Sequence, residues 1–280
     1  MSAGFFVLVI IIVTTLASYK GFTNSRFFDD YEFEVDRILM DKQYYRLVTQ
    51  GFLHTGWMHL GFNMFSLYVF SGVLTMGLGV FAFLLIYFSS LIGGGLLSLF
   101  IHRNHGSYSA VGASGATCGV LFASVALYPQ MGISMFPLPF TMPSWLYAVL
   151  FAGFSVYGIR SRKDNIGHDA HLGGALVGMV LVLMLNPDAF LNNYAIILMI
   201  LVPSVIFIYV IIKRPELLFV DNLFYKNQKD FYSVDHRDNA QRANRQQEVD
   251  RILDKIGRSG MGSLTRKERQ TLKDYSKGRG

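Results

Sequence analysis

The stretch MHLGFNMFSLYVFSGVLTMGLGVFAFLLIYFSSLIGGGLLSLF, residues 58–100, is apolar almost throughout. A helix needs about 20 apolar residues to span a bilayer. The stretch is long enough for two such helices, at residues 58–76 and 80–100, with only Gly77-Leu78-Gly79 between them. We therefore expect a tight transmembrane hairpin here.

Further apolar segments lie on both sides of this hairpin. We expect helices at residues 3–18, 113–128, 143–159, 168–185 and 194–212. The first segment lacks the basic region of a signal peptide, so we expect it to be retained. Residues 19–57 form a polar loop whose aromatic side chains suit the headgroup zone, and residues 129–142 form an apolar connector along the membrane. Asn186-Pro187-Asp188 is expected to break the chain before the last helix.

The composition agrees with a membrane protein. Of the 280 residues, 52% are hydrophobic and only 16% are charged, whereas a soluble domain is about one quarter charged. The whole net charge of +6 lies in the tail after residue 212. The single cysteine excludes an internal disulfide framework and a cysteine-based structural zinc site.

The tail has the pattern of a small soluble helical hairpin. Apolar residues recur at helical spacing at Val249, Ile252, Leu253 and Ile256. Residues 257–262 are a flexible turn, and Thr265 with Glu268 forms a capping box at the start of a last short helix. We therefore expect an all-α membrane protein in three parts: a core of six transmembrane helices at 1–190, a seventh helix at 191–213, and a soluble basic tail at 214–280.

Polar residues that are unusual at membrane depth gather near one face. Consecutive spanning helices alternate in direction, so the second, fourth and sixth helices start from the same side. Their first turns carry His59 and Asn63, then Ser114, then His168 and His171. Polar groups inside a bilayer are costly and usually functional. A serine with an imidazole partner is the minimal activated nucleophile, which predicts acyl-transfer chemistry in the membrane.

The residues around this pair support that interpretation. Gly112 and Gly115 flank Ser114 and would expose its hydroxyl. The spacing of Gly174 and Gly178 is a small-residue stripe that permits the close helix contact needed to bring His171 to Ser114. His59 and Asn63 are four residues apart, so they share a helix face, and both are good donors to an oxyanion.

The motifs together resemble the rhomboid intramembrane serine proteases, in the bacterial type with a helical C-terminal tail. The motifs are Gly-x-Ser-Gly at 112–115, His-x-x-x-x-His-x-x-x-Asn at 54–63, and His-x-x-Gly-x-x-x-Gly at 171–178. Arg46, preceded by Tyr45, resembles the family's Trp-Arg element in the first loop. The resemblance covers about residues 1–190 and implies a rhomboid-like six-helix transmembrane bundle.

The resemblance also implies a mechanism and a location. Ser114 would attack the peptide carbonyl, and His171 would take up the proton without an acidic third residue. Asn63, His59 and the Ser114 backbone N–H would hold the oxyanion. The substrates would be transmembrane segments of single-span membrane proteins, with membrane lipid as the other partner. We expect no cofactor, no nucleic-acid partner, and a multi-pass location in a bacterial inner membrane. Because Cys118 stands where many members have an aromatic residue against the histidine, the orientation of His171 must come from elsewhere.

Other interpretations stay open at this point. One is a non-catalytic pseudoprotease that binds membrane helices, although such relatives usually lack the serine or the histidine. Another is a metal or haem protein, but the sequence has no His-Glu-x-x-His motif, and we expect no metal site. The positive-inside rule places the active face in the cytoplasm, whereas the family places it outside. We interpret His54 as structural and expect His168 and Asp169 to cap the sixth helix or hold the last loop.

Overall fold

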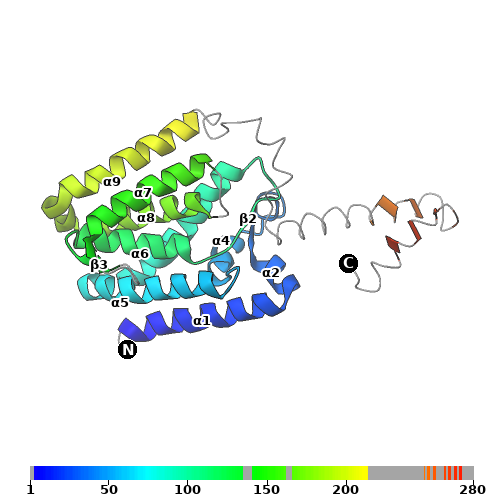
Figure 1. The fold of residues 1–280 in the computed structure, drawn as a ribbon, viewed down its shortest axis with the longest axis horizontal. Coiled ribbons are helices and arrows are strands. Elements are labelled where there is room, and N and C mark those ends of the chain that lie inside the picture. The colour runs from blue at the N-terminus through cyan, green and yellow to red at the C-terminus, as the bar shows by residue number, and fades with distance from the viewer. Residues whose placement is uncertain are drawn as a thin grey trace. The chain divides into compact units, whose positions relative to one another are not determined.

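The computed structural model describes residues 3–134, 141–161 and 166–213, and parts of 249–272. The chain divides into two compact units, Met1–Phe219 and Val220–Gly280, and each is described by itself. The long helices of the first unit are α1 (Ala3–Thr23), α5 (Trp57–His102), α6 (Ser114–Leu127), α7 (Ser144–Ser161), α8 (His168–Leu185) and α9 (Pro187–Lys213). Figure 1 shows α1 and α9 on opposite edges of this unit, with α6 and α8 between them.

Helix α5 is a hairpin of two spanning helices. Gly79, with φ of +83° and ψ of 173°, breaks its helical backbone. The first half runs parallel to α6, because Thr117 bonds to Asn63 and Ser124 bonds to the Phe70 carbonyl. The second half runs antiparallel to α8: Gly93 lies against Val177, and Leu97, four residues later in α5, lies against Gly173. The expected hairpin is confirmed, and its turn lies at the predicted glycines.

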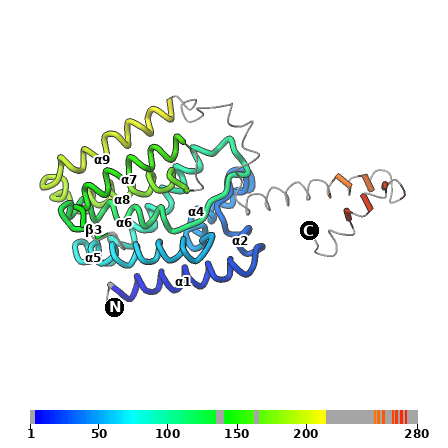
Figure 2. The backbone as a smooth tube through the Cα atoms, viewed as in Figure 1, coloured from blue at the N-terminus to red at the C-terminus, as the bar shows by residue number. Residues whose placement is uncertain are grey.

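The parallel starts of the second, fourth and sixth helices are also confirmed. Helices α6 and α8 run parallel, because Gly115 faces Gly174 and Gly119 faces Gly178. The first half of α5, α6 and α8 therefore begin at one end of the bundle. Figure 2 shows α2 and α4 gathered at that end and β3 at the opposite end.

The side chains are distributed as in a membrane protein. Four of the described helices, α1, α5, α8 and α9, are long and apolar enough to cross a bilayer, and α5 contains two spans. Large apolar side chains are exposed on their outer faces, such as Leu16, Phe81 and Val205, whereas Ser90, Ser98 and Ser155 are buried inside. Lipid is the solvent that suits such a surface. The first unit is an all-α multi-pass membrane bundle.

The helix boundaries differ from expectation in two places. The α1 helix extends to Thr23, five residues beyond the expected end. Asn186 ends α8, but Pro187 and Asp188 are already the first residues of α9, and the break in that helix lies at Asn193, with φ of −130° and ψ of 18°. The helix expected to start at Tyr194 is therefore confirmed, because the non-helical Asn193 directly precedes it. The segment from Pro187 was not expected to be helical, but a proline is tolerated in the first turn, where its missing N–H has no helical partner.

The segment expected to be a loop at 19–57 contains short ordered elements. After the end of α1 come α2 (Ser25–Tyr31), β1 (Phe33–Glu34), α3 (Val35–Leu39), α4 (Arg46–Thr49) and a 3-10 turn, η1 (Gln50–Phe52). Strand β1 pairs antiparallel with β2 (Ser109–Ala110), which lies shortly before Ser114. The connector after α6 contains a second antiparallel pair, β3 (Gly132–Ser134) with β4 (Thr141–Pro143).

The second unit contains the predicted capping box. The Thr265 backbone N–H donates to the Glu268 carboxylate at 2.7 Å, and the Glu268 N–H donates to Thr265 Oγ1 at 3.3 Å. Val249 and Ile252 are buried, as expected for the apolar face of a helix. Leu253 and most of the predicted turn at 257–262 lie outside the described residues.

Candidate active site

Glycine contacts bring the N-terminal ends of α6 and α8 together. A Cβ added at Gly174 would collide with the backbone of Gly115, and one at Gly178 would collide with the backbone of Gly119. A Cβ added at Gly115 would lie 3.2 Å from the carbonyl oxygen of Ala170. Ser114 directly precedes Gly115, and His171 directly follows Ala170, so both lie at the same end of two helices in backbone contact.

The turn before Ser114 requires glycine at position 112. Gly112 has φ of +133°, a conformation that side-chain-bearing residues rarely adopt. A Cβ there would also lie 2.8 Å from two atoms of the His59 ring and 3.7 Å from Ser114 Oγ. The His59 imidazole and the Ser114 hydroxyl therefore flank the same glycine. Ser114, His59 and His171 are all half-buried, as a site open to water requires.

Asn63 is fixed between α5 and α6. Its Nδ2 donates to the His59 carbonyl at 3.0 Å, and its Oδ1 accepts from Thr117 Oγ1 at 3.3 Å. The Thr117 hydroxyl is also 3.0 Å from the Ser114 carbonyl oxygen. Because an amide nitrogen carries two hydrogens, Asn63 keeps one N–H beyond its bond to His59. Thr117 was not among the residues expected from the sequence, since one threonine in an apolar segment gives no signal.

The His54 side chain anchors the segment before Ser114. The Ala113 N–H donates to His54 Nε2 at 3.3 Å, so that nitrogen is unprotonated and Nδ1 carries the hydrogen. Nδ1 then donates to Ser18 Oγ at 2.9 Å, and the Ser18 hydroxyl donates to the Phe52 carbonyl at 2.9 Å. Burial, with a smaller contribution from His59, lowers the pKa of His54 to about 3. His54 is therefore a neutral structural residue.

Arg46 organises the short elements that precede α5. It is 3% exposed, and its Nη1 donates to the carbonyls of Asp29 and Glu32 at 2.8 and 2.7 Å. Its Nε donates to Gln43 Oε1 at 2.7 Å. Burial, reinforced by Asp29, raises the pKa of the neighbouring Glu32 to about 7. These hydrogen bonds of Arg46 all go to residues that precede α5.

The side chain of His171 lies among rings. The Phe151 ring centroid is 5.8 Å from that of His171, and the His168 ring is 6.0 Å from it. Of the two roles expected for His168 and Asp169, capping α8 is not observed: among the described residues Gly167 is the N-cap and has no side-chain cap bond. The other expected role concerns the last loop, of which residues 162–165 lie outside the described residues. His168 is instead buried against Gly158, and Asp169 binds the second half of α5.

The Asp169 side chain on α8 contacts the end of α5, and the sequence did not predict this contact. Its Oδ2 accepts from Ser98 Oγ at 2.6 Å and lies 3.1 Å from His102 Nε2. The His102 ring stacks on Tyr108, with centroids 3.5 Å apart. This cluster fixes the start of α8 to the end of α5. It lies beside the candidate site and holds the helix on which His171 stands.

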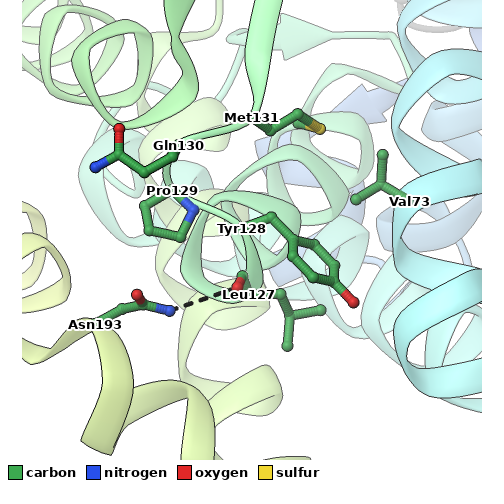
Figure 3. Close-up of a pocket in the computed structure, with 7 residues that line it drawn as sticks. All are labelled: Val73, Leu127, Tyr128, Pro129, Gln130, Met131 and Asn193. Carbon is green, nitrogen blue, oxygen red and sulfur yellow. Dashed lines mark hydrogen bonds between the residues drawn. The ribbon is translucent and has the colours of Figure 1, made fainter.

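The structure also has a pocket of about 500 Å³ that is separate from this site. It is lined by Val73, Leu127, Tyr128, Pro129, Gln130, Met131 and Asn193 (Figure 3). The Asn193 side-chain amide donates to the carbonyls of Ala126 and Leu127 at the end of α6, at 2.9 and 3.4 Å. Ser114 starts α6 and this pocket surrounds its end, so the pocket has no part in the chemistry proposed below.

Two family models match parts of the chain. A model of the Rhomboid domain matches residues 41–188, and a family of unknown function, DUF6576, matches residues 232–278. The chain is 31% identical over 137 residues to Rhomboid protein 1, mitochondrial, of Saccharomyces cerevisiae, covering 48% of this chain and 40% of that protein. It is 36% identical over 155 residues to Rhomboid-like protein 11, chloroplastic, of Arabidopsis thaliana, covering 51% of this chain and 53% of that protein.

A third relative, Rhomboid-type serine protease 2 of Emericella nidulans, is 26% identical over 151 residues, covering 52% of this chain and 28% of that protein. The chain thus spans about half, or less, of the length of these relatives. The domain match, however, covers more than half of the chain and contains Asn63, Ser114 and His171. On these grounds, the chain belongs to the rhomboid family.

Proposed function

We propose that the chain is an intramembrane serine endopeptidase that cleaves transmembrane segments of single-span membrane proteins through a Ser114–His171 dyad. The observation that carries the proposal is the glycine contact between α6 and α8, which sets both residues at one end of parallel helices. His59 and Asn63 start the third parallel helix beside them. The residues proposed as nucleophile, base and oxyanion donors therefore lie on three parallel helices that start at one end of the bundle.

The proposed reaction uses the dyad twice. His171 takes the proton of the Ser114 hydroxyl as Oγ attacks the scissile carbonyl, and it then gives that proton to the leaving amine. The acyl-enzyme that remains is hydrolysed by water, with His171 again acting first as base. The base and the nucleophile come from α8 and α6, so the distance between these helices controls the rate.

Three groups can hold the oxyanion. The first N–H groups of α6, starting at Ser114, have no partner within the helix and carry the positive end of its dipole. The spare N–H of Asn63 and the His59 imidazole lie beside them, with His59 held by Thr55 at 3.2 Å. Donors fixed by the fold before the reaction are worth most in a water-poor site.

A non-catalytic role in binding membrane helices is the second candidate. Similarity to a relative named as a serine protease favours catalysis, whereas several relatives are named only as rhomboid-like proteins. The presence of Ser114 and His171 together also favours catalysis. A bacterial inner membrane stays a prediction from the sequence alone, because the named relatives include mitochondrial and chloroplastic proteins.

The test is cleavage of a reporter with a single transmembrane segment by the purified full chain in liposomes. Ser114→Ala and His171→Ala should abolish cleavage, and Cys118→Ala should not. A fluorophosphonate probe should label the wild-type chain at Ser114. Undiminished cleavage by Ser114→Ala would refute the dyad, and folded wild-type protein that neither cleaves nor labels would favour the binding role.

A further inference from the structure

We propose that Phe151 on α7 is the residue that positions the His171 imidazole. The inference rests on the proposed function, since His171 has to be the base for its orientation to matter. Phe151 belongs to a helix that contributes no residue to the dyad or to the oxyanion donors. Figure 1 shows α7 alongside α8 in the first unit.

The contact is a ring-to-ring approach. The Phe151 and His171 centroids are 5.8 Å apart, and the two planes are tilted by 34°. Such a separation lies within the 4.5–7 Å range in which aromatic rings attract each other. It is also within the distance at which a ring face favours a cation, here the imidazolium that forms when His171 takes the serine proton.

The Phe151 ring is itself held in place. Tyr147, one turn earlier on α7, stacks on it with centroids 6.0 Å apart. Phe122 from α6 meets it edge-on at 5.9 Å and is 1% exposed. A ring fixed from both its own helix and α6 can transmit a defined orientation to His171, as a positioning residue must.

Cys118 on α6 does not supply a ring for this contact. It lies four residues after Ser114, so it shares the face of α6 that carries the nucleophile. It is 6% exposed and packs in the same apolar core as Phe122 and Phe151. A cysteine is too small to form a wall beside an imidazole, so the ring that does so has to come from another helix.

The experiment measures cleavage by the full chain in liposomes for Phe151→Leu, Phe151→Tyr and the double variant Cys118→Phe/Phe151→Leu. We expect Phe151→Leu to lower kcat about tenfold, with little change in KM, because the base is misoriented but the substrate still binds. Fluorophosphonate labelling of Ser114 should slow by a similar factor. Phe151→Tyr should keep most of the rate, and Cys118→Phe should restore part of the rate lost in Phe151→Leu.

Phe154→Leu is the matched control, because this ring lies one turn away on α7 and contacts His168 instead. A loss in Phe154→Leu equal to that in Phe151→Leu would show a general effect of α7 packing and overturn the inference. So would an unchanged kcat in Phe151→Leu when Ser114→Ala is inactive. If Ser114→Ala cleaves as fast as wild type, or wild type neither cleaves nor labels, the proposed function fails and this inference fails with it.

Discussion

The contact between Gly174 and Gly115 gives the sharpest quantitative prediction. A Cβ at position 174 would lie 2.7 Å from the Gly115 carbonyl carbon, whereas ordinary contact begins at 3.4 Å. The atoms it meets are backbone atoms, which cannot rotate away. In Gly174→Ala, α6 and α8 must therefore separate by roughly 0.7 Å or more.

That separation should affect both stability and rate. Overpacking of this kind costs about 1–3 kcal/mol, so the melting temperature in mild detergent should fall. Because Ser114 and His171 stand on the two helices that move apart, cleavage should slow by about ten- to a hundredfold, as a misplacement near 1 Å can cost a hundredfold. The assay compares initial cleavage rates in liposomes with melting temperatures of the same preparations.

Two other glycines provide graded controls. A Cβ at Gly72 meets nothing within 4 Å, so Gly72→Ala should leave the rate and the melting temperature unchanged or slightly improved. A Cβ at Gly93 meets the Val177 side chain and not backbone, so Gly93→Ala should fall between the two. A Gly174→Ala variant with the rate and melting temperature of Gly72→Ala would refute the packing argument. It would also weaken the case for a Ser114–His171 dyad.

Three further predictions concern the outer parts of the structure. Arg46→Lys should lower the unfolding free energy by about 2 kcal/mol in thermal melts, because an ammonium cannot reproduce the bonds to the carbonyls of Asp29 and Glu32. Since the pKa of Glu32 is raised to about 7, the folded state holds its proton where the unfolded state loses it, and stability should fall by up to about 3 kcal/mol as the pH rises from 4.5 to 7. Glu32→Gln should remove that pH dependence of the melting temperature. Thr265→Ala should abolish hydrogen-exchange protection of the Glu268 amide, which donates to the threonine hydroxyl.

Each of these has a result that contradicts it. An Arg46→Lys variant as stable as wild type would mean that the carbonyl contacts add nothing. A melting temperature that rises between pH 5 and 7 in wild type but not in Glu32→Gln would reverse the sign of the linkage. Unchanged exchange at Glu268 in Thr265→Ala would show that the capping box does not hold the tail helix.

The positions of the long helices could be predicted because a bilayer imposes simple rules. Each span must be apolar and about 20 residues long, and successive spans alternate in direction. These rules alone predicted that Asn63 and Ser114 start parallel helices, as the bond from Thr117 to Asn63 confirms. The α8 helix was predicted with its observed bounds, His168–Leu185.

The short elements between residues 19 and 57 could not be predicted in the same way. Helices of four or five residues, such as α3 and α4, are not stable alone and depend on tertiary contacts. For α4 these contacts are those of buried Arg46, whose partners lie 14 and 17 residues away. For α3 they are the bonds from the Val35 and Asp36 N–H groups to the carbonyls of Tyr108 and Gly106. Nothing in the local pattern identifies these partners, so the segment looked like a polar loop.

The candidate site likewise has residues that could be predicted from the sequence and contacts that could not. Motif spacing singled out Ser114, His171, His59 and Asn63, because polar residues are conspicuous in an apolar chain. Contacts such as that between Phe151 and His171 depend on the rotation of α7 against α8, which spacing within one helix does not determine. The partner of Asp169 could not be predicted for a related reason: His102 lies at the end of a different helix.

The hydrogen-bond chain through Ser18, His54 and Ala113 has a practical consequence for fragments of this protein. The family match begins at residue 41, whereas Ser18 lies in α1, well before that boundary. A fragment cut to the matched region would leave the His54 Nδ1–H without its acceptor, directly beside the backbone that precedes the nucleophile. The smallest fragment that keeps the hydrogen bonds of His54 therefore has to include Ser18 in α1.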